Sequence, residues 1–500
     1  MTAGGVGIYA PTLRHHNGTY YLVTTLNALL PPDLATAGPR SFYVTTTDIF
    51  NESSWSEPVY IDQPGIDPDI FFDDDGKVYL TLNVGRGISM AEIDITTGNS
   101  ITAYDPILNT SVPCPLPQLA EGPHIYKING TYYLLTAEVG TEAFHQSRIY
   151  RSRHIRGPWE SSPTNPLLFN GRDLSQGLLA TGHADMVEGL DGKWWAVFLA
   201  SRHYGPSNVT GWRQLGRETF LSPIEWHDDG WPTFNNGEPI TENMEGYLYD
   251  LPRPKLWRDD FNGRLADRNY YNIRTPMKDP LDLTSRPGFA RVRGNPYTLS
   301  QRSSPAALLR KQADVNVTFS TELTSYDPDP THPLRQEAGA SIYLNDFFHN
   351  DIGVAISNVT NNKAIVLRIS EGPVQLAFSP IALSTLLSIT SPICENTTSI
   401  PHGVSSGPSS YIQNVTLIED SGVAAGLPVT FFIEAKDIGY RLGYAVNGSQ
   451  PKYVGQVSNR WLDAGSLINF AGSHFAIYNA GGNYASLANA DFQYIQTELN

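Results

Sequence analysis

Four residues recur at one position of a repeated pattern, and two of them are carboxylates. The pattern is a short strand, an Asn-Gly or Asp-Gly turn and an aromatic-rich strand, and its turn glycines are Gly18, Gly76, Gly130 and Gly192. Nine residues before these glycines stand Tyr9, Asp67, Glu121 and His183. When such repeats are arranged radially, equivalent positions converge on one axis. A carboxylate pair there is a candidate for proton transfer, although polar residues at a channel mouth could equally bind solvent or fix strand starts.

The spacing of the repeats predicts the blades of a β-propeller. The turn glycines lie 58, 54 and 62 residues apart, which is room for a four-stranded sheet and its loops. A partial fifth hairpin, ETFLSPIEWHDDGWPTF, ends the array near Phe234. We therefore expect an all-β propeller domain over residues 1–237, with the four aligned residues facing one another across its channel.

The pattern changes after residue 237. The segment 238–257 is rich in proline and turn residues and is interpreted as a linker. From 258 to 500, alternating runs such as VTFSTEL, AIVLRIS and VTFFIEA are separated by turn residues, which predicts an antiparallel β-sandwich without an internal repeat. Because no similar convergence of carboxylates is visible there, we expect an accessory domain that packs or contacts carbohydrate.

Charge restricts the class of partner. The 500 residues carry 34 Lys and Arg against 50 Asp and Glu, a formal charge of −16. This charge repels phosphate backbones and anionic lipid, so we expect no nucleic-acid or membrane partner, and a neutral ligand fits better. No stretch approaches the roughly 18 apolar residues of a membrane span.

Cysteines and glycosylation motifs bear on the compartment. Cys114 and Cys394 are the only cysteines and are interpreted as buried thiols, their disulfide status being open. Ten glycosylation motifs favour an extracellular protein, and they begin at Asn17, Asn51, Asn109, Asn129, Asn208, Asn316, Asn358, Asn396, Asn414 and Asn447. Those at Asn17 and Asn129 also open Asn-Gly turns. The first residues show no signal peptide, and the cytoplasm is the alternative location.

The order of several motifs resembles a known family. YAPTLR, GIDPDIFFDDDG, AEGPHIYK, TGHADMV and LGRETFL resemble glycoside hydrolase family 43, the five-bladed propeller enzymes that include β-xylosidases and α-L-arabinofuranosidases. WRDDFN, SRPGFARVRG and EAGASIYLND resemble the concanavalin A-like C-terminal domain of larger β-xylosidases. The resemblance implies a hydrolase that removes terminal xylose or arabinose from xylan or arabinoxylan with inversion.

The resemblance also implies roles for the aligned residues. Glu121 in AEGPH is the implied general acid, and Asp67 in GIDPD holds that acid and tunes its pKa. Arg217 in LGRETFL contacts the sugar, and Tyr9 lines the sugar subsite or packs its blade. His183 in TGHAD lies on the axis, where some members use a histidine beside a structural calcium ion. No other cofactor is implied.

These residue types suit glycosidic cleavage. The leaving oxygen needs a proton, and a water molecule must be activated on the opposite face of the sugar. The charge of Asp67 would raise the pKa of Glu121 and keep it protonated near neutral pH. For Arg217, the alternative to sugar binding is an ion pair with Glu218 or Asp185.

One expected residue is absent from the sequence. Family members begin with a blade whose Asp-Pro motif supplies the general base, whereas this sequence opens at the YAPT of the second blade. It is interpreted as a fragment of an active enzyme, as a short form that binds glycans without hydrolysis, or as an enzyme whose base is Asp69. The first interpretation is favoured because the Asp67 and Glu121 pair is intact.

Overall fold

The computed structural model of the chain describes most of its residues. These are 7–27, 39–85, 87–108, 120–140, 144–173, 175–203, 214–242, 254–266, 268–276, 278–371, 412–426, 428–458 and 470–500. Cys114 and Cys394 lie outside them. Within these ranges, no helix is long and apolar enough to cross a membrane.

The first two sheets contain the strands of the first two repeats. The first sheet consists of β1 (Gly7–Ile8), β2 (Thr12–His16), β3 (Thr19–Asn27), β4 (Arg40–Thr46) and β5 (Val59–Pro64). The second consists of β6 (Ile66–Phe72), β7 (Val78–Asn83), β8 (Ile88–Glu92) and β9 (Asp105–Leu108). A short 3-10 helix, η2 (Glu52–Ser54), precedes β5.

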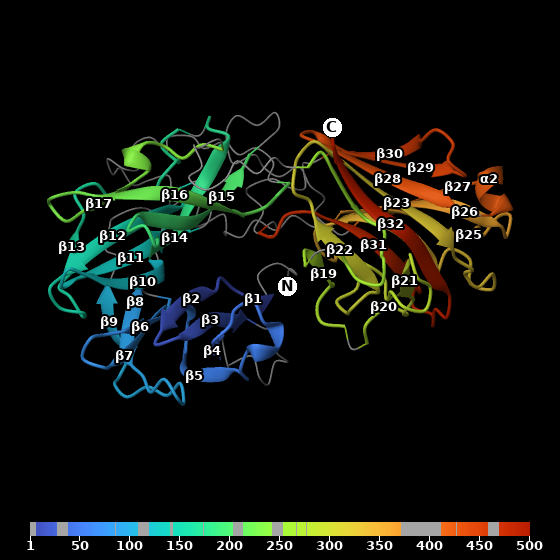
Figure 1. Ribbon diagram of the computed structural model, residues 1–500. Helices are drawn as coiled ribbons and strands as arrows, with labels where there is room; N and C mark the ends of the chain where they lie inside the picture. Colours follow the sequence, from blue (N-terminus) through green and yellow to red (C-terminus); the bar gives the residue numbers. More distant parts are fainter. Residues whose placement is uncertain are drawn as a thin grey trace.

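Two further four-stranded sheets follow. The third consists of β10 (Glu121–Ile128), β11 (Thr131–Glu138), β12 (Gln146–Ser152) and β13 (Glu160–Ser161). The fourth consists of β14 (Leu178–Glu188), β15 (Trp194–Arg202), β16 (Glu218–Trp226) and β17 (Pro232–Phe234), and η3 (Asn235–Gly237) follows it. Figure 1 shows the four sheets following one another around a common centre, as the blades of a propeller do. The predicted propeller is confirmed.

The partial fifth hairpin is present, but it does not begin a further sheet. Its two strands, β16 and β17, pair with β15 and with each other, so they are the outer strands of the fourth sheet. An Asp-Gly turn occurs twice in this repeat, once after the inner strand and once between the two outer strands. Such a turn alone therefore does not indicate a new sheet. The described residues therefore form four sheets of a propeller.

Turn chemistry and apolar packing explain this arrangement. Asn17 and Gly18 have φ of 49° and 78°, and Asn129 and Gly130 have 50° and 75°, the positive values that type I′ hairpins require. Each pair of consecutive sheets shares an apolar cluster. Because a strand places alternate side chains on opposite faces, the middle sheets can pack on both neighbours.

The sandwich consists of two sheets. The eight-stranded sheet contains β18 (Leu256–Asp259), β20 (Leu281–Asp282), β21 (Ala290–Arg293), β23 (Val317–Ser325), β28 (Val429–Lys436), β29 (Gly439–Val446), β30 (Lys452–Ser458) and β32 (Asn489–Leu499). The seven-stranded sheet contains β19 (Tyr270–Tyr271), β22 (Ala307–Lys311), β24 (Glu337–Tyr343), β25 (His349–Ile356), β26 (Lys363–Glu371), β27 (Ile412–Ile418) and β31 (His474–Ala480). The short helix α2 (Ser421–Ala425) follows β27.

The core of the sandwich lies between these sheets. Phe319 of β23 stacks on Phe475 of β31 with ring centroids 5.0 Å apart, and both side chains are buried. The predicted antiparallel sandwich is confirmed. The predicted linker falls partly outside the described residues, at 243–253, and the exact domain bounds stay a prediction.

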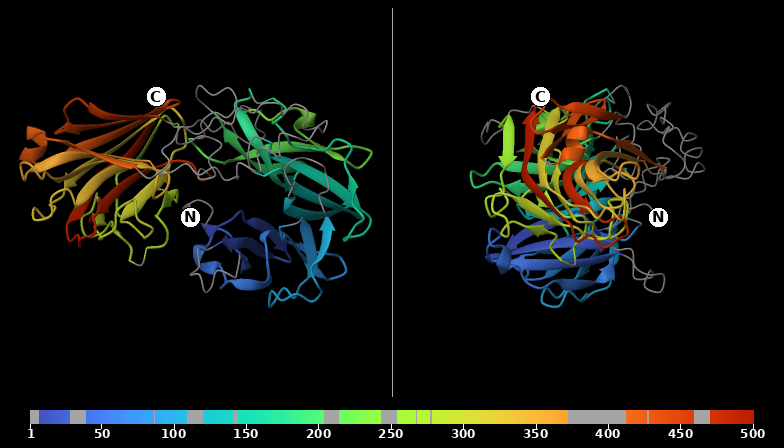
Figure 2. Two further views of the ribbon diagram at one scale, coloured as in Figure 1. Left: turned by 180° about the vertical axis from the view of Figure 1, so that it is seen from behind. Right: turned by 90° about the vertical axis from the view of Figure 1, so that its right-hand side faces the viewer.

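The two domains meet close to Arg217. The N–H of Ser473 donates a 2.8 Å hydrogen bond to the carbonyl oxygen of Gln214. A Cβ atom on Gly216 would lie 2.3 Å from the backbone nitrogen of Gly472. This approach is too close for any side chain, so the backbones of the two domains touch. Figure 2 shows the sandwich beside the propeller from two further directions.

Candidate active site

Backbone irregularities at the same place in three inner strands position the site. The pairing of β6 with β7, of β10 with β11 and of β14 with β15 shifts register next to Asp67, Glu121 and His183 respectively. Asp67 and His183 have φ of 54° and 53°, unusual for residues other than glycine. Bulges of this kind redirect side chains and occur beside active sites. The three aligned side chains therefore leave the regular alternation of their strands.

Glu121 and Asp67 form an interacting pair of carboxyl groups. Burial, together with the charge of Asp67, raises the pKa of Glu121 to about 7, although the positive charge of Arg217 acts against this shift. The carboxylate of Asp67 accepts a 3.2 Å hydrogen bond from the N–H of Gly122. This bond ties Asp67 to the backbone next to Glu121. Near neutral pH, Glu121 can therefore hold a proton and release it, as a general acid must.

His183 packs on the glycine that follows the acid. Gly122 has φ of 54°, and a Cβ atom there would lie 2.6 Å from Cδ2 and Nε2 of the His183 ring. Burial lowers the pKa of His183, and Arg217 lowers it further, whereas Asp67 acts in the opposite direction. The ring is thus neutral at pH 7, with one nitrogen able to donate and the other able to accept a hydrogen bond.

We expect Gly122→Ala to impair glycan binding. The new methyl group collides with the His183 ring and also places a side chain at positive φ, which costs stability of roughly 1 kcal/mol. Gly130→Ala is the matched control, because Gly130 has φ of 75° and a Cβ atom added there would meet nothing within 4 Å. Calorimetric titration with a xylo-oligosaccharide should show weaker binding for Gly122→Ala alone. Equal binding by both variants would contradict this assignment.

Arg217 is held by the sandwich domain. Its guanidinium carbon lies 4.6 Å from the centroid of the Phe470 ring. The backbone N–H of Arg217 donates a 3.0 Å hydrogen bond to the carbonyl oxygen of Phe470. The Lys311 ammonium donates to the carbonyl oxygen of Arg217 at 3.4 Å. Sequence reasoning missed Phe470, since no motif links it to the propeller. The sandwich thus contributes a residue to the surroundings of Glu121.

The ion pairs suggested as the alternative for Arg217 are made by other arginines. The carboxylate of Glu218 lies 2.8 Å from Arg202, and that of Asp185 lies 2.7 Å from Arg14. Both carboxylates are therefore neutralised by a guanidinium group already. Arg217 also acts on the site electrostatically, because its positive charge lowers the pKa of Glu121.

A second polar cluster joins the inner strands of all four sheets. Arg14 on β2 contacts Asp69 on β6 at 2.8 Å, Asp185 on β14 at 2.7 Å and Nδ1 of His124 on β10 at 2.9 Å. Asp69 is fully buried and also accepts a 3.0 Å hydrogen bond from the N–H of Ile125. A general base must reach water. This geometry argues against Asp69 as the base and indicates a structural role for the cluster.

Tyr9 lies between β1 and β2 and is tied to the first sheet. Its N–H donates to the carbonyl oxygen of Thr25 at 2.9 Å, and its carbonyl oxygen accepts from Thr24 Oγ1 at 2.8 Å. Its hydroxyl accepts from the Asn27 amide. These bonds place Tyr9 at the start of the inner strand, as the repeat predicts. A contact of Tyr9 with sugar stays a prediction.

Metal binding near His183 finds little support in the described side chains. Among these residues, no three of the types His, Cys, Asp and Glu gather into a group that could hold a metal ion. Calcium takes roughly six to eight oxygen ligands, whereas the Asp185 carboxylate is bound by Arg14 and Tyr126. The Asp185 carboxylate is therefore already engaged, and we assign no step to a calcium ion.

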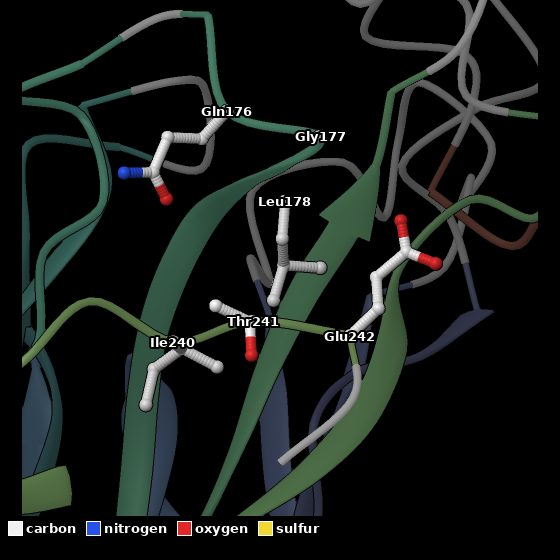
Figure 3. A pocket seen from close by; sticks show the side chains of 6 residues that line it. All are labelled: Gln176, Gly177, Leu178, Ile240, Thr241 and Glu242. Carbon is white, nitrogen blue, oxygen red and sulfur yellow. The ribbon is translucent and has the colours of Figure 1, made fainter.

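A surface hollow elsewhere is not the candidate site. It has a volume of about 420 Å³ and is lined by Gln176, Gly177, Leu178, Ile240, Thr241 and Glu242 (Figure 3). Glu242 is the only acid among them and lies 3.8 Å from Arg202. The hollow therefore lacks the pair of carboxyl groups found at Asp67 and Glu121.

Comparison with known sequences agrees with this geometry. The sequence model of glycosyl hydrolases family 43 matches residues 1–232, and that of the beta xylosidase C-terminal concanavalin A-like domain matches residues 258–383. A Xylan 1,3-beta-xylosidase of Vibrio sp is 33% identical over 385 residues, which cover 71% of this chain and 69% of that protein. The non-reducing end alpha-L-arabinofuranosidase BoGH43B of Bacteroides ovatus is 34% identical over 362 residues. These cover 70% of this chain and 63% of that protein, so the chain spans less than two thirds of this relative.

Solved structures share the fold. The Bacteroides ovatus Xyloglucan PUL GH43B superposes with a TM-score of 0.78 at 26% identity, over 99% of this chain and 86% of that one. The xylan beta-1,4-xylosidase from Bacillus halodurans C-125 has the same fold, with a TM-score of 0.79 at 24% identity over 99% of this chain and 87% of that one. With a propeller, an accessory sandwich and an acid pair at the propeller's inner strands, the chain belongs to glycosyl hydrolase family 43.

Proposed function

We propose that the chain is a glycoside hydrolase of hemicellulose that removes terminal xylose or arabinose from xylan or arabinoxylan, with Glu121 as its general acid. The observation that carries this proposal is the pKa of Glu121, raised to about 7 by burial and by Asp67. The names of the relatives, which are xylosidases and arabinofuranosidases, support the substrate class.

In the proposed reaction, Glu121 donates its proton to the glycosidic oxygen as the bond to the sugar breaks. The charge of Asp67 keeps this proton bound until the leaving group develops its negative charge. Arg217 directs its fork of N–H donors at sugar hydroxyls. An inverting enzyme also needs a base about 6.5 to 9.5 Å from the acid, with water between them. We assign this base to none of the described residues.

A non-hydrolytic glycan-binding protein is the second candidate. The observation that favours it is the engagement of Asp69 with Arg14, which removes the acid suggested as a substitute base. Release of pentose from an aryl β-D-xyloside and an aryl α-L-arabinofuranoside, measured beside calorimetric binding of xylo-oligosaccharides, separates the two. Turnover supports the hydrolase. Binding without turnover supports the second candidate, and neither binding nor turnover would contradict both.

We expect Phe470→Ala to weaken sugar binding by up to about thirtyfold. The ring of Phe470 fixes the Arg217 guanidinium through a cation–π contact, an interaction worth roughly 0.5 to 2 kcal/mol. Phe289→Ala is the matched control, because Phe289 makes the same kind of contact with Arg286 at 3.7 Å within the sandwich. Calorimetry should show the loss for Phe470→Ala only. An equal loss in both variants would indicate a general effect on folding instead.

The location outside the cell stays part of the proposal, supported by the glycosylation motifs. The proposed ligand of the protein is a neutral carbohydrate, in keeping with the net charge of −16. The expected calcium ion beside His183 stays a prediction that metal titration of the purified chain can test.

A further inference from the structure

Three side chains of the sandwich form a linear chain of hydrogen bonds. The hydroxyl oxygen of Ser300 lies 2.8 Å from Nε2 of His349. Nδ1 of the same ring lies 2.9 Å from both carboxylate oxygens of Asp351. A serine, a histidine and an aspartate linked in this order are recognised as a nucleophile, its base and the group that orients the base, whatever the fold that carries them.

The hydrogen-bond partners of His349 indicate which of its ring nitrogens carries a proton. A buried carboxylate accepts hydrogen bonds, so Nδ1 of His349 carries the proton that points to Asp351. In the imidazole tautomer with its proton on Nδ1, Nε2 is an acceptor to which the Ser300 hydroxyl can donate. This is the tautomer in which a histidine can remove a proton from a serine.

The seven-stranded sheet holds the histidine and the aspartate rigidly. They stand two residues apart on β25 and therefore share one face of the sheet. Ser341 on the neighbouring β24 donates a 2.7 Å hydrogen bond to Asp351, and the Tyr343 ring stacks on His349. His349 and Asp351 are 0% and 2% exposed. Ser300 is less buried than His349 and Asp351, so it is the one of these three side chains that a ligand can reach.

Gln413 places a hydrogen-bond donor beside the serine. Arg368 only donates hydrogen bonds, and it lies 3.1 Å from Oε1 of Gln413, so this amide oxygen must face Arg368. The NH2 group of Gln413 therefore faces Ser300, whose hydroxyl oxygen lies 3.1 Å away. Glu337 in turn holds Arg368 at 2.7 Å. An oriented donor here could stabilise negative charge that develops next to Ser300.

We propose that Ser300 is the nucleophile of a second hydrolytic site, in the sandwich domain, which cleaves small carboxylic esters. The Ser300 oxygen bonds to the ester carbonyl carbon while its proton passes to Nε2 of His349. The carbon–oxygen bond to the alcohol then breaks, and the alcohol leaves with that proton. Water attacks the acyl carbon, gives a proton to His349, and releases the acid as the serine regains its proton.

The reaction proposed for the propeller does not use this site. His349 and Asp351 lie on β25 of the sandwich, and Figure 1 shows β25 on the opposite side of the molecule from β6 and β10. A purely structural role for the chain of bonds would pin the loop before β22 against the sheet. Such a role predicts no reaction at Ser300, so covalent labelling separates the two explanations.

The experiment treats the whole chain with an alkyl fluorophosphonate and locates the adduct by peptide mass spectrometry. We expect one adduct on Ser300 and a burst of p-nitrophenol from p-nitrophenyl acetate. Ser300→Ala should lose both. Ser303→Ala is the matched control, since Ser303 lies in the same loop and is similarly exposed, and it should keep both. Absence of an adduct on Ser300 in the folded wild-type chain would overturn the proposal.

Two more variants test the roles of the partners. Asp351→Asn should slow labelling by about 10³- to 10⁴-fold, because the wrong tautomer of His349 then faces the serine. Gln413→Leu, at an exposed position, should slow it by about 10²-fold, and it keeps the test valid if Asp351→Asn unfolds. Glu121→Gln should leave labelling unchanged. Labelling of Ser300 at the wild-type rate in both partner variants would contradict the proposed roles.

Discussion

Replacing Glu121 by Gln is expected to lower the release of pentose from aryl glycosides by about 10²- to 10⁴-fold. Gln keeps the size of the side chain and removes the proton that the leaving oxygen needs. The loss should be largest for substrates whose leaving groups are poor, because a good leaving group departs without protonation. The test is therefore to measure the rates with a series of aryl xylosides that differ in their leaving groups. An equal loss for every leaving group would contradict the role of Glu121 as acid.

Stability provides the control for this variant. The pKa of Glu121 is about 7 in the folded chain against an ordinary value of 4.5. The folded state therefore prefers the protonated acid, and its stability falls as pH rises from 4.5 through 7. An amide at this position cannot ionise, so the Glu121→Gln chain should be more stable than wild type at pH 8, on the order of 1 to 3 kcal/mol. Denaturation at pH 8 and at pH 4 checks both the sign and the folding of the variant.

Asp67→Asn should move the pH range of activity downward. The variant removes the negative charge that raises the pKa of Glu121, so the acid loses its proton at lower pH and the alkaline limb of the rate profile shifts down. Asn tolerates the φ of 54° at this position, and its amide oxygen can still accept the hydrogen bond from Gly122. We therefore expect a large fall in activity at pH 7 with the fold preserved.

The matched control is Asp74→Asn. Asp74 has an 83% exposed side chain and lies in the turn that follows β6, where it pairs with Lys127. Its replacement removes the same charge from the same hairpin without touching Glu121. Kinetics from pH 4 to 9 should show the downward shift for Asp67→Asn alone. A profile that stays in place for Asp67→Asn would contradict the coupling of the two carboxyl groups.

The sequence predicted the parts of the site that depend on the repeat. Turn glycines at positive φ fix the hairpins, and counting back from them leads to Asp67, Glu121 and His183. The bulges next to these residues were not predictable, because they depend on how each strand pairs. Gly122 was also missed, since its need for glycine comes from a ring on another sheet. The fifth hairpin forms within the fourth sheet, because a turn signal does not indicate which sheet its strands join.

Contacts within the second domain were harder to predict. Ser300 and His349 are distant in sequence, and nothing in the sequence indicates that the three polar residues that open the strand HNDIGVAI are buried. In the structure every residue of β25 is buried. Phe470 was invisible for a similar reason, because only the meeting of two domains brings it to Arg217. Local patterns thus predict strands and turns but not which polar faces become covered.

The central claim is that Glu121 is an acid kept protonated by burial and by Asp67. Titration of the Glu121 carboxyl group, followed by infrared difference spectroscopy between wild type and Glu121→Gln, measures this directly and needs no turnover. We predict a midpoint at about 7 and a lower midpoint in the Asp67→Asn chain. A midpoint near the ordinary value of 4.5, or one that Asp67→Asn leaves unchanged, would contradict the account.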